Sequence, residues 1–195
     1  MKNKIRNVCD LVLGILFMVS VIAGYYKDIS YMSEYCFISG IVVGAVFLFS
    51  FFYATYGKKR LPLWVYFDCM IAIVIIFIAT IAIGLNLEGA FWFIHIINPI
   101  LLFVYWCVFC NHNDIHKLKL IATDTIFPIG YFVFAFILWK TTGNCRFPAS
   151  LILIGNSLGV ILLYVVGIIA LFLVIGYALH FLNLLAYRII TKTDD

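Results

Sequence analysis

The sequence contains few charged residues. Asp, Glu, Lys and Arg make up 11% of the 195 residues, whereas 66% of the residues are hydrophobic and the mean hydropathy is +1.14. A chain of this composition has too little polar surface to enclose a soluble core of ordinary size. The scarcity of charge therefore excludes a soluble globular protein and predicts an integral membrane protein.

The sequence also lacks internal repeats, low-complexity tracts and linkers, so we expect a single domain over residues 1–195. The lack of a repeat argues against the inverted-repeat architecture of many secondary transporters. The first apolar run follows a basic start but ends in "AGYYKDIS", without the small-residue pattern of a signal-peptide cleavage site. We interpret this run as a membrane span that is retained.

Six apolar runs approach the length of about 20 residues that crosses the hydrocarbon core of a bilayer. They cover residues 8–26, 35–56, 63–85, 91–110, 121–139 and 158–187. The predicted fold class is therefore all-α, an integral bundle of six transmembrane helices in the cell membrane. The last apolar stretch, from "SLILIGNSLG" onward, exceeds one span, so we expect its first residues to lie apart from the descending helix, at the outer surface.

The distribution of positive charge predicts the orientation. Ten of the 13 Lys and Arg residues lie in the N-terminal segment, the second-to-third loop, the fourth-to-fifth loop and the C-terminal tail. Positive residues concentrate on the cytoplasmic side of membrane proteins, so we expect both termini in the cytoplasm. Topology thus explains the net charge of +4, and membrane lipid rather than nucleic acid is the expected partner.

The six cysteines predict neither a disulfide framework nor a metal site. Four of them fall in the expected cytoplasmic half, and a bond between the other two, Cys36 and Cys145, would pin a helix to a loop. Near the end of the fourth run lie four residues of zinc-ligand type: Cys107, Cys110, His112 and His116. They lack the usual long spacer between two ligand pairs, so we expect no bound metal and no cofactor.

A histidine lies within the fourth apolar run. A charged side chain costs about 2.5 to 3.5 kcal/mol in the middle of a membrane helix, so an ionisable residue there requires a partner or water. His95 lies about one turn below the expected outer end, and Pro99 lacks the amide that would bond to the His95 carbonyl. The pair predicts a bend and a polar notch, in which the imidazole serves either as a base or only in packing.

Other polar side chains are expected at the same outer depth. The second apolar run begins with "EYCFISG", which brings Cys36 and Ser39 to one side of a helix within about one turn. Asn98 and Asn156 add amide groups near this level. Such a set suits acyl-transfer chemistry, with His95 as base, Cys36 or Ser39 as nucleophile and the amides as oxyanion donors.

Three further ionisable residues lie near the expected cytoplasmic ends of helices. For Asp10 and Asp68 we favour pairing with a local Lys or Arg, and a proton or ion path is the alternative. His180 is expected at interface depth, and we assign it no role.

Three short motifs resemble those of a known family. They are "HIINP" in the fourth run, "PIGY" with Pro128 and Tyr131 in the fifth run, and the loop segment "RFP" with Phe147 and Pro148. With spans in this order, they make most of the chain similar to the androgen-induced-gene family of multipass membrane proteins and its bacterial six-span relatives.

Animal members of that family hydrolyse fatty acid esters of hydroxy fatty acids, using a threonine early in helix two and a histidine in helix four. The resemblance implies that His95 is the corresponding histidine. The threonine belongs to a pattern like F-T-x-x-S-N, and alignment of its Ser-Asn with Ser39 and Gly40 puts Cys36 at the threonine position. A thiol can also attack an ester, so this departure weakens the enzyme interpretation without excluding it.

The leading hypothesis is a membrane-embedded hydrolase of acyl-lipid esters that works from the outer leaflet. His95 is its base, Cys36 its nucleophile and Ser39 the second candidate nucleophile. One alternative is a small transporter or channel, in which Asp10, Asp68 and His95 line one path. The other is a structural or interaction protein without chemistry, in which the same polar groups only hold helices together.

Overall fold

In the computed structural model, which describes residues 2–110, 123 and 125–192, every regular element is a helix or helical turn. The long helices are α1 (Lys2–Tyr25), α2 (Tyr35–Tyr56), α3 (Leu63–Ile83), α4 (Asn98–Phe109), α6 (Ile126–Thr142) and α8 (Leu158–Lys192). The short elements are the 3₁₀ turn η1 (Ile29–Ser33), the π turn η2 (Phe93–Ile97) and α7 (Ala149–Leu153). The all-α fold class is confirmed.

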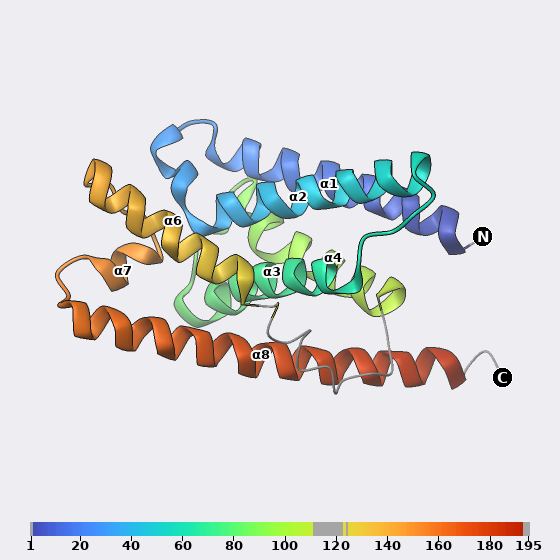
Figure 1. The fold of residues 1–195 in the computed structure, drawn as a ribbon. Coiled ribbons are helices and arrows are strands. Elements are labelled where there is room, and N and C mark those ends of the chain that lie inside the picture. Colours follow the sequence, from blue (N-terminus) through green and yellow to red (C-terminus); the bar gives the residue numbers. More distant parts are fainter. Residues whose placement is uncertain (1, 111–122, 124, 193–195) are drawn as a thin grey trace.

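The long helices run alternately in opposite directions, and both chain termini lie at the same end of the bundle (Figure 1). We call this the termini end. The opposite end carries η1, the loop between α3 and η2, and α7 (Figure 1). Short connections favour this arrangement, because neighbouring antiparallel helices need only a few residues between them.

Within the described residues, four helices are long and apolar enough to cross a membrane: Asn3–Tyr25, Tyr35–Tyr56, Leu63–Ile83 and Leu158–Ile190. Two shorter apolar helices, Phe93–Phe109 and Ile126–Thr142, overlap the runs expected as the fourth and fifth spans. The chain therefore has the long apolar helices of a membrane protein. α1 and α8 extend past the expected ends, because polar residues such as Lys4 and Arg188 continue the helical backbone without adding hydropathy.

Glycines let α1 and α2 pack closely side by side (Figure 1). A Cβ atom on Gly14 would lie 2.7 Å from Leu48 Cγ, and one on Gly44 would lie 2.8 Å from Met18 Cγ. Larger side chains at these positions would push the helices apart, which is why small residues are common at membrane-helix interfaces. The close antiparallel pair holds the end of α1 beside the start of α2.

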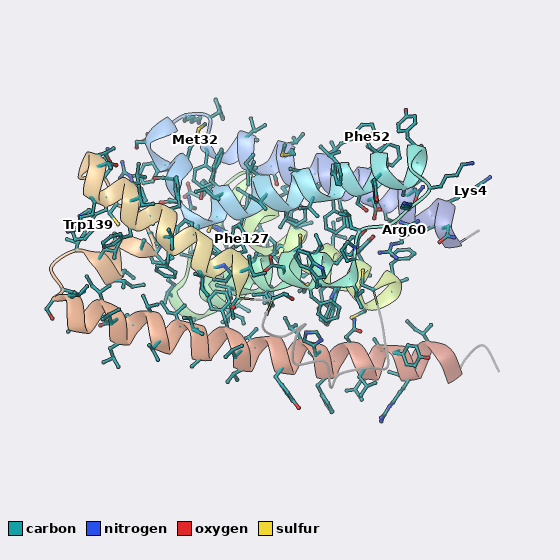
Figure 2. All side chains as sticks on the ribbon, viewed as in Figure 1. Lys4, Met32, Phe52, Arg60, Phe127 and Trp139 are labelled. Atoms are coloured by element: carbon teal, nitrogen blue, oxygen red, sulfur yellow. The ribbon has the colours of Figure 1, made fainter. Side chains whose placement is uncertain are left out.

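α8 lies along one side of the bundle, and many of its apolar side chains face outward (Figure 2). The short helix α7 precedes it, and Gly155, with a φ of +76°, lies between the two helices. This left-handed backbone suits glycine, which has no Cβ to clash. The first residues of the last apolar stretch thus form a separate element, as expected from its excess length.

Aromatic side chains fill the core between α2, α3 and α4. The Phe47 ring lies 5.0 Å from that of Tyr105, and the Phe67 ring lies 4.8 Å from that of Trp106, both edge to face. α8 joins this core through His180, whose buried ring stacks on Phe67 at 4.1 Å. Ring packing therefore holds together the helices that carry the buried polar groups.

Candidate functional site

A cavity of about 410 Å³ opens at the end opposite the termini, between α1, η1, α2 and η2. We call it the His95 cavity. Four of its lining residues can take part in chemistry: Tyr25, Glu34, Cys36 and His95. The fold thus brings to one cavity the thiol and the imidazole that the sequence places only at a similar depth.

A second hollow, of about 310 Å³, lies between α6 and α8. Its lining is apolar apart from Thr125, and it contains no ionisable side chain among the residues that the structure describes. An acyl chain fits such a surface, but no ionisable side chain accompanies the Thr125 hydroxyl group as a base among the described lining residues. The candidate site is therefore the His95 cavity.

His95 lies in the π turn η2, which is wound more widely than an α-helix. The Asn98 N–H bonds to the Phe93 carbonyl, five residues earlier. Pro99 has no N–H, and its ring would clash with the His95 carbonyl in a regular α-helix. Where the sequence predicts a bend, the structure therefore has a π turn, an irregularity that is frequent at functional sites.

One hydrogen bond orients the His95 ring. Its Nδ1 lies 2.6 Å from the backbone oxygen of Asn86, and the side chain is only 4% exposed. A carbonyl oxygen only accepts hydrogen bonds, so Nδ1 carries a proton. In the neutral imidazole Nε2 then has a lone pair, and it has no hydrogen-bond partner among the described residues. His95, a residue of the cavity wall, therefore carries a buried proton acceptor.

Cys36 is the second residue of α2, and its side chain is 6% exposed. The first N–H groups of an α-helix have no intrahelical partner, and the helix dipole favours negative charge beside them. Both effects stabilise the oxyanion that forms when a nucleophile attacks a carbonyl group. The start of α2 thus suits a nucleophile.

Ser39 lies one turn deeper and is fully buried. Its hydroxyl group donates to the Tyr35 carbonyl at 2.7 Å and lies 3.3 Å from the Cys36 carbonyl. Serine in a helix commonly bonds in this way to the preceding turn. Ser39 is not among the described residues that line the His95 cavity, so the geometry favours Cys36 as the nucleophile.

The two amides expected as oxyanion donors have other partners. Asn98 donates from Nδ2 to Ser20 Oγ at 2.8 Å, and Asn156 donates to the Ile152 carbonyl at 3.0 Å. Neither lines the His95 cavity in the described part of the chain. The sequence predicts only that these amides lie at a depth similar to that of His95. It does not predict their contacts, because a side-chain amide bonds to whichever group the tertiary fold places beside it. Backbone N–H groups at the start of α2 are the available oxyanion donors.

The rim of the His95 cavity is charged. Asp28 accepts hydrogen bonds from Ser30, which lower the pKa of its carboxyl group. Glu34 accepts a hydrogen bond from the Tyr25 hydroxyl at 3.0 Å. Burial raises the pKa of the Glu34 carboxyl group, against the opposing effects of the Tyr25 bond and of the Arg146 charge. A carboxyl group with a raised pKa is suited to exchanging protons near neutral pH.

The three motifs that resemble the family meet at this end of the bundle. His95 belongs to "HIINP", and Phe147 of "RFP" lines the same cavity. The Phe147 carbonyl accepts a hydrogen bond from the hydroxyl group of Tyr131, in "PIGY", at 3.3 Å. Motifs that are far apart in the sequence therefore contribute to one local structure.

A second cluster of buried polar groups lies at the termini end. Asp10 is fully buried, and its Oδ1 accepts a hydrogen bond from the Tyr105 hydroxyl. Its Oδ2 accepts from Ser50 at 2.8 Å and lies 3.5 Å from Arg60 Nη1. Ser50 Oγ lies 2.6 Å from the Tyr66 hydroxyl. We call these five residues the Asp10 network; they confirm that Asp10 pairs with a nearby basic residue.

The basic residues of this end extend the network. Arg60 donates to Asn7 Oδ1 at 2.6 Å and to the Asn3 carbonyl at 3.2 Å, so it ties the α2–α3 loop to the start of α1. Arg6 donates from Nε to the Tyr105 hydroxyl at 3.0 Å. Charge-assisted bonds of this kind are the stronger class of hydrogen bond. The network therefore links four helices.

The cysteines and histidines near the end of α4 are described only in part. Cys107 and Cys110 are described, whereas His112 and His116 lie outside the described residues. Within the described ranges, no group of three or more His, Cys, Asp or Glu side chains is placed to hold a metal ion. Cys110 accepts a hydrogen bond from Arg6 Nη2 at 3.6 Å. All six cysteines are described, and none of them forms a disulfide.

No protein-family model, curated protein or solved structure matches this chain. The resemblance to the androgen-induced-gene family is therefore carried by the three short motifs and the residues around them. Any assignment of function depends on the chemistry of the His95 cavity.

Proposed function

We propose that the chain is a six-span protein of the cell membrane with both termini in the cytoplasm. The alternating helix directions support this topology, as do the two shorter apolar helices in the places of the fourth and fifth spans. Basic side chains at the termini end, among them Lys4 and Arg60 (Figure 2), agree with the expected cytoplasmic side. The His95 cavity then lies toward the outer leaflet.

Cysteine labelling in intact cells tests this orientation. Thr142 and Lys59 are exposed and lie at opposite ends of the bundle. A membrane-impermeant maleimide should label the Thr142→Cys variant and leave Lys59→Cys unlabelled until the cells are opened. Labelling of Lys59→Cys but not Thr142→Cys in intact cells would reverse the orientation.

The protein acts as a membrane-embedded hydrolase of acyl-lipid esters. The observation that carries this proposal is that Cys36 and His95 line one cavity, and that His95 Nε2 has no hydrogen-bond partner among the described residues. A nucleophile and a base in one buried pocket are the parts that covalent acyl transfer needs. A substrate that is itself a lipid can reach such a pocket from the membrane.

The reaction takes place in two halves. Cys36 Sγ attacks the ester carbonyl carbon, and the alcohol leaves as a thioester forms. Water then attacks the thioester while His95 Nε2 takes a proton from it, and the fatty acid and the thiol are released. The first-turn N–H groups of α2 that follow Tyr35, whose own N–H bonds to the Phe147 carbonyl at 3.5 Å, stabilise the negative oxygen in both halves.

A transport path through Asp10 and His95 has weaker support. The two residues lie at opposite ends of the bundle, and most of the buried α1 side chains between their levels, Leu13, Phe17 and Val21, are apolar. The buried Ser20 of α1 is already bonded to Asn98, so an ion would find few polar partners in this layer, which is costly. A structural role without chemistry accounts for the Asp10 network but leaves the unpartnered Nε2 of His95 without an explanation.

Hydrolysis of a long-chain ester probe by purified protein in lipid nanodiscs tests the proposal. Cys36→Ala should abolish turnover, and Cys36→Thr, which supplies the residue type of the resembled family, should keep part of it. Ser39→Ala is the matched control, because Ser39 bonds within its own helix, and it should keep most of the activity. A wild-type protein that does not hydrolyse the probe would reject the assignment.

A further inference from the structure

Tyr25 lines the His95 cavity together with Cys36 and with a carboxyl group at the cavity rim, Glu34. Its hydroxyl group donates to Glu34 Oε2 at 3.0 Å. The Tyr25 ring is held edge to face by Phe37 at 5.4 Å and by Phe91 at 5.3 Å, and it is 4% exposed. The hydroxyl group is therefore fixed beside a half-buried carboxyl group in the cavity that the buried Cys36 also lines.

The hydrogen-bond donors along this chain point in one direction. A phenol has one proton to donate, and in Tyr25 that proton goes to Glu34. The phenol oxygen can therefore only accept from a thiol S–H. The order thiol, phenol, carboxylate is the one required to move a proton from Cys36 to Glu34.

We propose that Glu34 is the base that activates Cys36, with Tyr25 passing the proton between them, and that His95 acts on the water of the second half-reaction. This assignment deepens the proposed hydrolase function and rests on it for the substrate. The change in thiol reactivity that it predicts needs no ester.

Protons balance in both halves of the reaction. In the first, the Cys36 proton moves to the Tyr25 oxygen as the Tyr25 proton moves to Glu34, the S–C bond forms and the ester C–O bond breaks. The same path in reverse delivers the proton to the leaving alkoxide, which becomes the alcohol. In the second, His95 Nε2 takes a proton from water as it attacks, the thioester C–S bond breaks, and His95 returns that proton to the thiolate.

Charged and titratable groups around Glu34 set the pH range in which it acts. Beyond the relay itself, the groups that face it are Lys27, Asp28, Tyr31, His95 and Arg146. Glu34 accepts a proton only while it is ionised, so activation is lost as the pH falls through its pKa. Because burial raises that pKa, the loss should occur at a higher pH than for an exposed glutamate.

The rate of alkylation of Cys36 by iodoacetamide tests the relay. The full-length protein in nanodiscs is alkylated across a pH series, and mass spectrometry of the Cys36 peptide gives the rate for this thiol alone. Glu34→Gln should slow alkylation near neutral pH by about tenfold and remove the acidic limb of the pH profile. Tyr25→Phe keeps the carboxylate but breaks the relay, and it should slow alkylation to a similar extent.

The sign of the Glu34→Gln effect separates the relay from simple electrostatics. A carboxylate that only repelled the thiolate would have the opposite effect, and its removal would speed alkylation. Asp28→Asn is the matched control. It removes a carboxylate from the same rim, but that carboxylate bonds to Ser30 instead of to Tyr25. It should leave the acidic limb in place. Faster or unchanged alkylation in Glu34→Gln, or unchanged alkylation in Tyr25→Phe, would overturn the relay.

Trapping of the acyl-enzyme distinguishes this division of roles from the hydrolase function itself. With the ester probe, His95→Ala should accumulate a thioester on Cys36 that intact-mass spectrometry detects, whereas Glu34→Gln should not. Accumulation in neither variant while the wild-type protein turns over would overturn the assignment of His95 to the second half. If the wild-type protein does not hydrolyse esters but the alkylation results hold, the hydrolase proposal fails and the relay stands.

Discussion

At the termini end, the carboxylate of Asp10 bonds to Tyr105 and Ser50 and pairs with Arg60, so both of its oxygens have partners. At the opposite end, His95 lines a cavity and bonds through Nδ1, whereas its Nε2 has no partner in the part of the chain that the structure describes. Both residues are buried. A buried ionisable group is therefore fully hydrogen-bonded at one end of the bundle and only partly hydrogen-bonded at the other.

This difference in hydrogen bonding indicates which end of the bundle contributes to stability and which end to function. A fully bonded polar network stabilises the helices that it joins, and its groups have no capacity left for a ligand. A buried acceptor without a partner costs about 1 to 3 kcal/mol, which a substrate or water can recover by bonding to it. We therefore expect substitutions at the termini end to change unfolding, and those around the His95 cavity to change turnover.

The largest expected effect is that of His95→Ala on hydrolysis. Turnover of the long-chain ester probe should fall about 10³-fold, because the general base is lost. The free energy of unfolding should change by only about 1 kcal/mol, since a single hydrogen bond is removed. If His95→Ala is as active as the wild-type protein, the histidine serves only in packing.

Asp10→Ala should produce the reverse pattern. It leaves Tyr105 and Ser50 without their acceptor, so the free energy of unfolding should fall by about 3 kcal/mol, as measured by denaturation in mixed micelles. Loss of the Arg60 charge pair adds little, because that side chain is 24% exposed. Turnover per folded molecule should be unchanged. A variant with wild-type stability would contradict the role given to the Asp10 network.

Tyr105→Phe removes the hydrogen bond that the hydroxyl group donates to Asp10 and the one that it accepts from Arg6, and it should lower the free energy of unfolding by about 1 to 2 kcal/mol. Tyr164→Phe is a suitable control, because Tyr164 is 49% exposed on α8. Thermal unfolding of the two variants side by side measures the difference. Equal melting temperatures would show that the Tyr105 hydroxyl contributes no net stability.

The smallest effect is expected for Pro99→Ala. Alanine restores the missing N–H, so the π turn should tighten and move the imidazole, which should lower turnover about tenfold. Stability should be retained or slightly increased, because alanine favours a helix. Pro128→Ala, in α6, controls for loss of a proline away from the His95 cavity and should retain full turnover. Equal turnover in Pro99→Ala and Pro128→Ala would show that the π turn does not contribute to catalysis.

The fold class and the basic partner of Asp10 could be predicted from the sequence, because hydropathy and the cost of buried charge act locally. The other Asp10 partners could not. Ser50 and Tyr105 lie 40 and 95 residues from Asp10 in the sequence. The hydropathy of the apolar runs that contain them does not depend on whether these side chains face lipid or a carboxylate.

In the candidate site, too, only part of the residues could be predicted from the sequence. His95 could be predicted because an ionisable residue is unusual in an apolar run, and Cys36 because it lies at the same expected depth, whereas Tyr25 and Glu34 lie at a helix end, where polar residues are ordinary. The helix-internal bond of Ser39 could have been foreseen, since serine often bonds to the preceding turn. The carbonyl that orients His95 belongs to a loop residue, Asn86, whose position depends on the complete fold.

The apolar part of α8 is longer than the hydrocarbon layer of a membrane is thick. Its apolar part, Leu158–Ile190, has 33 residues and measures about 50 Å, whereas the hydrocarbon layer measures about 30 Å. Such a helix must tilt, project from the bilayer or thicken the lipid around it. We expect α8 to stand more upright in long-chain phosphatidylcholine than in short-chain phosphatidylcholine, and polarised infrared spectroscopy of oriented bilayers would measure this change.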